Sequence, residues 1–228
     1  MSERVEKTEE VLLTEVEAKK LLREAGIPVI ETRLAKTKRE AVSISREIGF
    51  PVVLKVISKD IIHKSDVGGV KVGLTGASQV SNAYSEMLAS IKQKMPEARI
   101  EGVSVQRMAT SGVELIIGMN KDPQFGPVIM FGLGGILVEV LKDISFRLVP
   151  LSRRDAAEMV REIKGYALLQ GYRGQDPVDI LHLEETIVKV SDFIDNNPQI
   201  KELDINPLFA SGKNIVAADA RVVLEAGS

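Results

Sequence analysis

The spacing of helix and strand signals changes near the middle of the chain. Up to Arg107, helix patterns with their own start and stop residues alternate with short apolar strands. From Gly112 to Pro150, apolar runs follow each other closely and are separated by Asp-Pro, Gly-Gly and Lys-Asp turn signals. This change predicts two units, a compact α/β unit followed by a unit built on an antiparallel sheet.

Local signals bound the elements expected in the first unit. Thr14 and Glu17 form a capping-box pattern that opens a helix, and a second helix is expected between Thr37 and Gly49. A third helix is expected over residues 81–94, because Pro96 stops the pattern. The expected strands cover residues 29–35, 51–57, 70–74 and 100–108.

Short apolar runs dominate the second unit. The expected strands cover residues 112–119, 127–133, 136–140, 146–150, 200–205 and 214–219. Two helices are expected between them, over residues 152–164 and 184–196.

Composition argues against several classes of function. The 30 Lys and Arg residues and 32 Asp and Glu residues give a formal charge of -2 and are spread along the chain, so nucleic acid is not an expected partner. No apolar run approaches the roughly 18 residues of a spanning helix, and the first residues lack the pattern of a signal peptide. We therefore expect a cytoplasmic protein without a membrane partner. The absence of cysteine excludes disulfides and thiolate chemistry within the sequence.

Lys55 lies within the apolar strand pattern VVLKVI. Strand alternation directs its side chain to the face opposite Leu54 and Val56. A lysine in a buried strand needs an anionic partner, and a phosphate suits the compact charge of an ammonium group. The alternative is an ordinary strand lysine whose ammonium group lies in water.

A histidine and a glycine pair follow this strand. Gly68 and Gly69 would let the backbone approach a ligand and turn its N–H groups toward a phosphate, although such a pair is also common in hairpin turns. His63 precedes them, and a neutral imidazole is a competent nucleophile toward a phosphoryl group, with Asp66 as a group that orients it. The alternative is a surface histidine, which is how we interpret His182.

Oxygen-bearing side chains gather near the end of the sequence. Asp204, Asn206 and Asp219 lie at or near the ends of two expected neighbouring strands. Carboxylate and amide oxygens suit Mg²⁺, which binds one or two protein carboxylates together with substrate phosphates and water. The alternative is a turn, because Asp-x-Asn-Pro is good turn chemistry.

A partial dinucleotide fingerprint lies between these groups. Gly132 and Gly134 have the spacing of its first two glycines, but Leu137 stands where the third is expected, and strand-like residues follow. The sequence therefore argues against a Rossmann unit here.

From about Thr14 onward, an ordered series of motifs resembles the ATP-grasp β subunit of ADP-forming acetyl-CoA synthetases. In chain order, the motifs are GFPVVLKV, HKSDVGGVKVGL, VSVQRM, GVELIIGM, DPQFGPVIMFGLGGILVEVLKD, GYRGQDPVD and ELDINPL. The resemblance implies an α/β (α+β) ATP-grasp fold of two subdomains with the nucleotide between them. It implies an N-terminal helix in residues 1–24 that packs on the larger subdomain, a smaller subdomain over 25–107 and a larger one over 108–228 with the metal site. The implied enzyme interconverts acyl-CoA, ADP and phosphate with the free acid, CoA and ATP.

The resemblance also assigns roles to single residues. His63 is the implied acceptor of phosphate. Asn206 and Asp219 are the implied Mg²⁺ ligands, while Glu202 and Asp204 are weaker candidates for ribose or metal contacts. Gln106, Arg107 and Met108 form the implied hinge beside the adenine. The residues implied to bind ATP or ADP are Lys55, Gly68, Gly69, Val70, Gln106, Arg107, Met108, Glu114 and Asp204.

The implied partner is a separate α subunit that carries the CoA and acyl sites, in an α2β2 assembly whose substrates include acyl-CoA and phosphate. Within these 228 residues we find no second relay histidine and no CoA-binding unit. Two alternatives stay open: a β subunit of the succinyl-CoA synthetase type, and a non-catalytic nucleotide-binding regulatory module in which His63 is inert. The sequence leaves the acyl group and the choice between ADP and GDP open.

Overall fold

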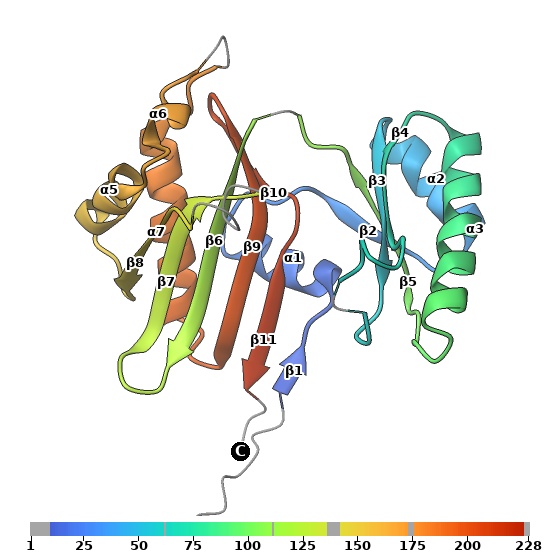
Figure 1. The fold of residues 1–228 in the computed structure, drawn as a ribbon, viewed down its shortest axis with the longest axis horizontal. Coiled ribbons are helices and arrows are strands. Elements are labelled where there is room, and N and C mark those ends of the chain that lie inside the picture. Colours follow the sequence, from blue (N-terminus) through green and yellow to red (C-terminus); the bar gives the residue numbers. More distant parts are fainter. Residues whose placement is uncertain (1–9, 62, 111, 136–141, 173–175, 226–228) are drawn as a thin grey trace, which may run out of the picture. The chain divides into compact units, whose positions relative to one another are not determined.

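The computed structural model describes residues 10–61, 63–110, 112–135, 142–172 and 176–225 (Figure 1). The chain forms two compact units. The smaller unit comprises Thr14–Lys19 and Ile30–Thr110, and the larger unit comprises Met1–Leu13, Lys20–Val29 and Ser111–Ser228. The first helix, α1 (Glu15–Glu24), therefore contributes its first residues to the smaller unit. The domain bounds expected from the sequence remain a prediction.

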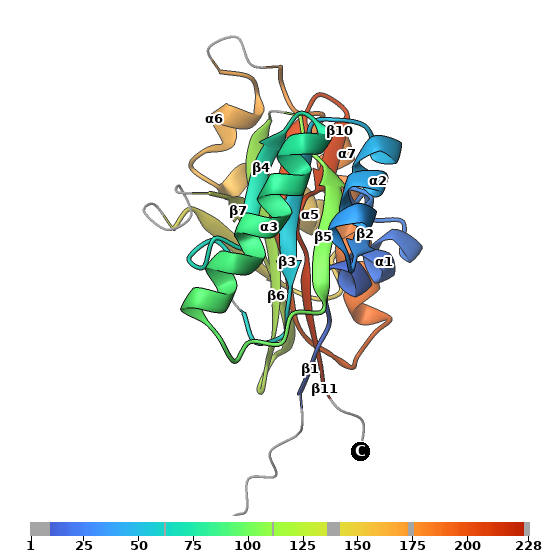
Figure 2. The ribbon, with the colours of Figure 1, turned by 90° about the vertical axis from the view of Figure 1, so that its right-hand side faces the viewer.

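The smaller unit is a four-stranded antiparallel sheet with two helices on one face (Figure 2). In sheet order, its strands are β2 (Thr32–Ala35), β5 (Gly102–Arg107), β3 (Val52–Ile57) and β4 (Val70–Leu74). The helices are α2 (Lys38–Ile48) and α3 (Ala77–Lys94). Leu54 and Val56 of β3 belong to the hydrophobic core of this unit, together with Met87 and Ile91 of α3. Apolar side chains on one face of the sheet thus hold the helices in place.

Capping residues explain where these helices begin. The Thr37 side chain accepts a hydrogen bond from Glu40 N, and Gly49 ends α2 with φ +88°, as the sequence predicted. The prediction for α3 was four residues too short at its start. The backbone N–H and hydroxyl of Thr75 both donate to Gln79 Oε1, at 2.7 and 3.0 Å, and stabilise the earlier beginning.

The larger unit is built on a seven-stranded antiparallel sheet. In sheet order, the strands are β1 (Glu10–Leu12), β11 (Arg221–Glu225), β9 (Ile200–Ser211), β6 (Val113–Asp122), β7 (Gly126–Leu133) and β8 (Ile144–Leu148), with β10 (Asn214–Ala217) paired to β9. The helices are α5 (Arg153–Glu162), α6 (Tyr166–Leu169) and α7 (Ile180–Asp195), of which α5 and α7 pack on β7.

The predicted antiparallel sheet is confirmed, with differences in detail. The sequence missed β1, β11 and α6, and it placed the start of α7 at residue 184. Asp179 caps α7 by accepting a hydrogen bond from His182 N, so the helix begins at Ile180. The expected strand over residues 136–140 lies outside the described residues. No helix in the described part of the chain is both long and apolar enough to cross a membrane.

Candidate functional site

Lys55 is buried in the middle of β3, with 7% of its surface exposed. Its neighbours Leu54 and Val56 face the core beneath the helices, so the predicted alternation is confirmed. The Lys55 ammonium group lies 2.9 Å from Glu15 Oε1. The alternative of a strand lysine with its charge in water is therefore wrong.

Glu15 is the centre of a buried ionic cluster that was not predicted from the sequence. Its Oε1 accepts hydrogen bonds from Lys19 Nζ at 2.8 Å and Lys55 Nζ at 2.9 Å, and its Oε2 accepts one from Lys64 Nζ at 3.4 Å. Burial alone would raise the pKa of Glu15. The charges of Lys55, Lys19 and Lys64 outweigh burial and lower this pKa to about 2. Glu15 is therefore ionised at any physiological pH.

The buried cluster extends to the end of β5. Lys19 also donates to Thr32 Oγ1 at 3.0 Å and to Gln106 Oε1 at 2.6 Å. The sequence held a signal for this arrangement, because residues 15, 18, 19 and 22 form one stripe of a helix. Ala18 and Leu22 in that stripe are fully buried. A charged pair in an apolar stripe predicts buried ionic contacts.

The segment expected to form the hinge begins inside this cluster. Gln106 is buried, whereas Arg107 is exposed and Met108 exposes 43% of its surface. Met108 N donates to Pro51 O at 2.9 Å, which joins the end of β5 to the start of β3. The structure thus places one predicted hinge residue in the interior and two at the surface.

His63 is exposed and begins a tight turn that leads into β4. Asp66 N donates to His63 O at 3.3 Å. Gly68 N and Gly69 N donate to Ser65 O at 3.0 Å and Lys64 O at 2.7 Å. Both glycine N–H groups are thus bound within the turn in this conformation.

Gly69 lies where neighbouring atoms leave no room for a side chain. A Cβ atom at this position would lie 2.6 Å from Val56 Cγ1 and 2.8 Å from Lys64 O. Gly69 O also accepts a hydrogen bond from Val56 N, and the next residue, Val70, pairs with Lys55 across the sheet. The glycine thus ties the turn that follows His63 to the strand that carries Lys55.

The larger unit brings the predicted metal ligands together. Asp204 and Asn206 lie two residues apart on β9, and Asp204 pairs with Arg221 of β11. Ala218 N donates to Pro207 O at 2.9 Å, which places Asp219 beside this part of β9. Glu114 is exposed near the start of β6 and pairs with Phe209 of β9.

Electrostatics in this region favour a cation. Burial raises the pKa of Asp204, and the nearby carboxylate of Asp219 raises it further, while Arg221 opposes both effects. Among the described residues, no group of three or more His, Cys, Asp or Glu side chains is arranged to hold a metal ion. Two carboxylates with the Asn206 amide nevertheless fit Mg²⁺, because this ion takes few protein ligands when substrate phosphates complete its coordination.

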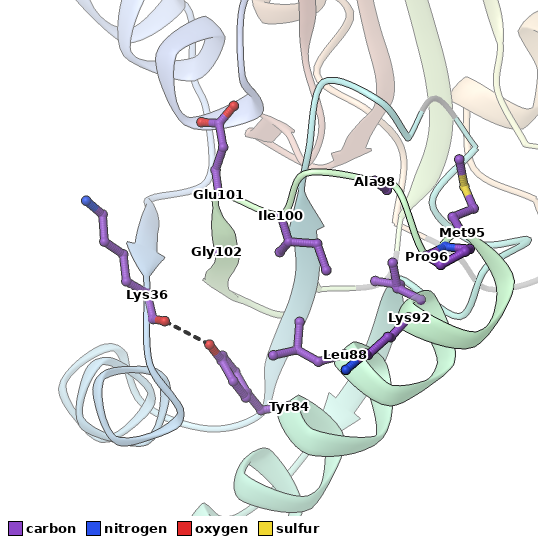
Figure 3. A pocket seen from close by; sticks show the side chains of 11 residues that line it. Lys36, Tyr84, Leu88, Lys92, Met95, Pro96, Ala98, Ile100, Glu101 and Gly102 are labelled. Atoms are coloured by element: carbon purple, nitrogen blue, oxygen red, sulfur yellow. Dashed lines mark hydrogen bonds between the residues drawn. The ribbon is translucent and has the colours of Figure 1, made fainter.

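A separate groove lies in the smaller unit beside α3 (Figure 3). It has a volume of about 380 Å³, and its walls include Leu88, Met95 and Ile100. The Tyr84 hydroxyl donates to Lys36 O at 3.0 Å at one side of it. The predicted site residues are not part of its lining.

The sequence matches the model of the ATP-grasp domain family over residues 4–224. It is 49% identical to the β subunit of ADP-forming acetate–CoA ligase I from Pyrococcus furiosus, covering 96% of this chain and 94% of that one. The chain belongs to the ATP-grasp family. Within that family it belongs to the group formed by the β subunits of ADP-forming acetate–CoA ligases. The predicted fold and family are thus confirmed.

Solved ATP-grasp structures support the same assignment. Acetyl-coenzyme A synthetase 1 of Candidatus Korarchaeum cryptofilum, in complex with coenzyme A and Ca-AMPCP, matches with a TM-score of 0.91 and 51% identity over 93% of each chain. Another structure of that synthetase contains coenzyme A and Mg-AMPPCP, and its phosphohistidine segment points towards the nucleotide binding site. It matches with a TM-score of 0.82 and 47% identity, over 93% of this chain and 92% of that one.

The succinate-specific branch is more distant. The β subunit of an ADP-forming succinate–CoA ligase from Halorubrum lacusprofundi is 25% identical, and this chain spans 54% of it. The succinyl-CoA synthetase alternative is therefore not favoured.

Proposed function

We propose that this chain is the nucleotide-binding β subunit of an ADP-forming acyl-CoA synthetase and that His63 carries the phosphoryl group. The observation that carries the proposal is a pair of features in the smaller unit. Lys55 offers a buried ammonium group, and His63 is exposed on a turn whose Lys64 contacts the same carboxylate as Lys55. A phosphate-binding lysine and a nucleophile are thus linked through one side chain, Glu15.

In this proposal, ATP or ADP binds through charge and backbone contacts. Lys55 contacts the phosphates, where a buried ammonium group acts strongly because little water screens it. The segment from Gln106 to Met108 lies beside the adenine. Val70, which pairs with Lys55, and the turn at Gly68 and Gly69 lie on the phosphate side. Glu114 and Asp204 of the larger unit complete the set of nucleotide contacts.

Asn206 and Asp219 would hold Mg²⁺, which supplies charge neutralisation at the phosphates. The raised pKa of Asp204 has burial as its main cause and the Asp219 carboxylate as its second, and a bound cation would relieve the repulsion between the two carboxylates. This arrangement supports Asp204 as an additional contact in the metal region.

The chemical step at His63 is an in-line displacement. A neutral ring nitrogen of His63 uses its lone pair to form a bond to the γ-phosphorus of ATP, and the bond between that phosphorus and the β–γ bridging oxygen breaks. ADP leaves with the electron pair of the broken bond. The reverse step transfers the phosphoryl group from His63 to ADP and regenerates ATP and the neutral imidazole.

The rest of the reaction belongs to a partner. The proposal includes a separate α subunit with the CoA and acyl sites, an α2β2 assembly, and acyl-CoA and phosphate as substrates of the complex. The support is the match along almost the full length of a β subunit from a ligase. A cytoplasmic location, where ATP and CoA are available, is part of the proposal.

Labelling with [γ-³²P]ATP and Mg²⁺ tests the proposal. We expect acid-labile, alkali-stable ³²P on the wild-type chain and none on His63→Ala, while calorimetry shows nearly unchanged ATP affinity in that variant. His182→Ala is the matched control, because His182 is the other histidine of the sequence, and it should label like the wild type. Nucleotide binding without labelling would instead favour a regulatory module. Full acyl-CoA synthesis by His63→Ala in the presence of the α subunit would exclude His63 as the phosphoryl carrier.

A further inference from the structure

One carboxylate connects the phosphate-binding lysine to the histidine segment. Glu15 Oε1 accepts from Lys55 at 2.9 Å, and Glu15 Oε2 accepts from Lys64 at 3.4 Å. Lys64 is the residue directly after His63. The residue next to His63 is therefore ion-paired with the same carboxylate that contacts Lys55.

The surroundings make this ion pair stronger than an ordinary surface pair. The Glu15 side chain is 1% exposed and the Lys64 side chain is 22% exposed. The neighbouring pair between Lys71 and Glu86 is far more exposed, at 35% and 66%. Water and salt screen a half-buried pair less, so the Glu15–Lys64 contact restrains its segment more than the pair on β4 does.

The other end of the turn is held independently of Glu15. Lys94 Nζ and Ser90 Oγ of α3 donate to Asp66 O at 2.8 Å and to Val67 O at 2.9 Å. These contacts fix the residues that lead into β4. Among the described residues, the Lys64 side chain ties the beginning of the turn, where His63 lies, to α1.

We propose that the Glu15–Lys64 ion pair is a latch that positions His63 beside Lys55 for phosphoryl transfer with the nucleotide. This inference rests on the proposed function and adds a role for two residues that the site assignment does not use. Lys64 is a positioning residue, because it acts through the orientation of His63. Release of His63 toward a second site then requires that this ion pair break, while the contacts of Asp66 and Val67 with α3 persist.

The latch has a specific kinetic signature. Lys64→Gln removes the charge without removing Lys55 from Glu15. We expect single-turnover labelling of His63 from [γ-³²P]ATP to slow about tenfold, because the contribution of a partly buried ion pair lies between those of exposed and buried pairs. The affinity for Mg-ADP should stay within about twofold of the wild type. Lys64→Arg restores the charge and should recover most of the rate. Lys71→Gln is the matched control and should label like the wild type.

The outcomes separate the latch from the proposed function. Labelling of Lys64→Gln at the wild-type rate, or labelling of Lys64→Arg as slow as that of Lys64→Gln, overturns the latch while His63 remains the acceptor. Loss of the label from the wild type, or its persistence in His63→Ala, overturns the proposed function itself. Melting temperatures of the two Lys64 variants close to that of Lys71→Gln show that the rates report on positioning.

Discussion

At the residue scale, Glu15 keeps its charge where burial opposes it. Three ammonium groups lie within 3.4 Å of its oxygens, and their attraction exceeds the cost of desolvation. Removal of the carboxylate charge would leave these ammonium groups without that attraction. We expect Glu15 to matter for stability and for the position of Lys55.

The pKa of Glu15 predicts a stability change in acid. Burial tends to raise this pKa, but the three lysines lower it from the ordinary value of 4.5 to about 2. The stabilisation is therefore complete above about pH 4.5 and is lost as the pH falls toward 2. A lowering of the pKa by this much corresponds to about 3 kcal/mol of stability.

Urea unfolding of Glu15→Gln measures this effect. At pH 7 we expect the variant to lose a few kcal/mol, in keeping with about 3 kcal/mol for the charge. The difference from the wild type should shrink as the pH is lowered from 4.5 to 3. Glu86→Gln, at an exposed ion pair, is the control and should change stability by less than about 1 kcal/mol. A difference that does not vary with pH would contradict the assigned pKa.

Substitutions at the proposed metal ligands should separate their contributions. Asp219→Asn removes an anionic oxygen from a hard-cation site, so we expect about tenfold weaker binding of Mg-ADP. Asn206→Ala removes a neutral ligand and should weaken binding by less. Calorimetry with Mg-ADP is the direct measurement, and unchanged affinity in both variants would place the metal site elsewhere.

At the scale of elements, local signals made much of the structure predictable. Thr14, Thr37 and Ser152 stand at the starts of helices, and strand alternation gave the orientation of Lys55. β1 and β11 were missed because β1 has only three residues and pairs with the end of the chain. The close contact of Gly69 with Val56 could not be predicted, because it depends on strand pairing, which the local sequence does not specify.

The packing of Gly69 predicts the effect of a single methyl group. Gly69→Ala would place a Cβ atom against Val56 Cγ1 and Lys64 O, at 2.6 and 2.8 Å. Because the backbone carbonyl cannot move aside cheaply, we expect a loss of about 2 kcal/mol in the free energy of unfolding. Gly76→Ala is the control, since nothing lies within 4 Å of a Cβ there. Equal losses in urea unfolding would show that the turn tolerates the methyl group.

At the scale of the whole molecule, the sequence indicated phosphate chemistry but did not indicate the buried ion pairs of Glu15. The pattern around Lys55 pointed to phosphate, while the roles of Gln106 and Glu114 came only from family resemblance. Glu15 was missed because it is 40 residues from Lys55 and 49 from Lys64, and such contacts form only through the tertiary fold. Asp204 and Asp219 were expected to be neighbours because they lie at or near the ends of strands that were expected to be adjacent. The pairing of β9 with β10 and β11 explains their proximity.

We propose that this chain binds the nucleotide and carries the phosphoryl group, whereas a second subunit forms the thioester. An assay of the purified chain with acetate, CoA, ATP and Mg²⁺ tests it most directly, with and without added α subunit. We predict no steady acetyl-CoA production by the chain alone and turnover once the α subunit is present. Steady acetyl-CoA production without the α subunit would contradict this division of the reaction, because it would place all of its steps within these 228 residues.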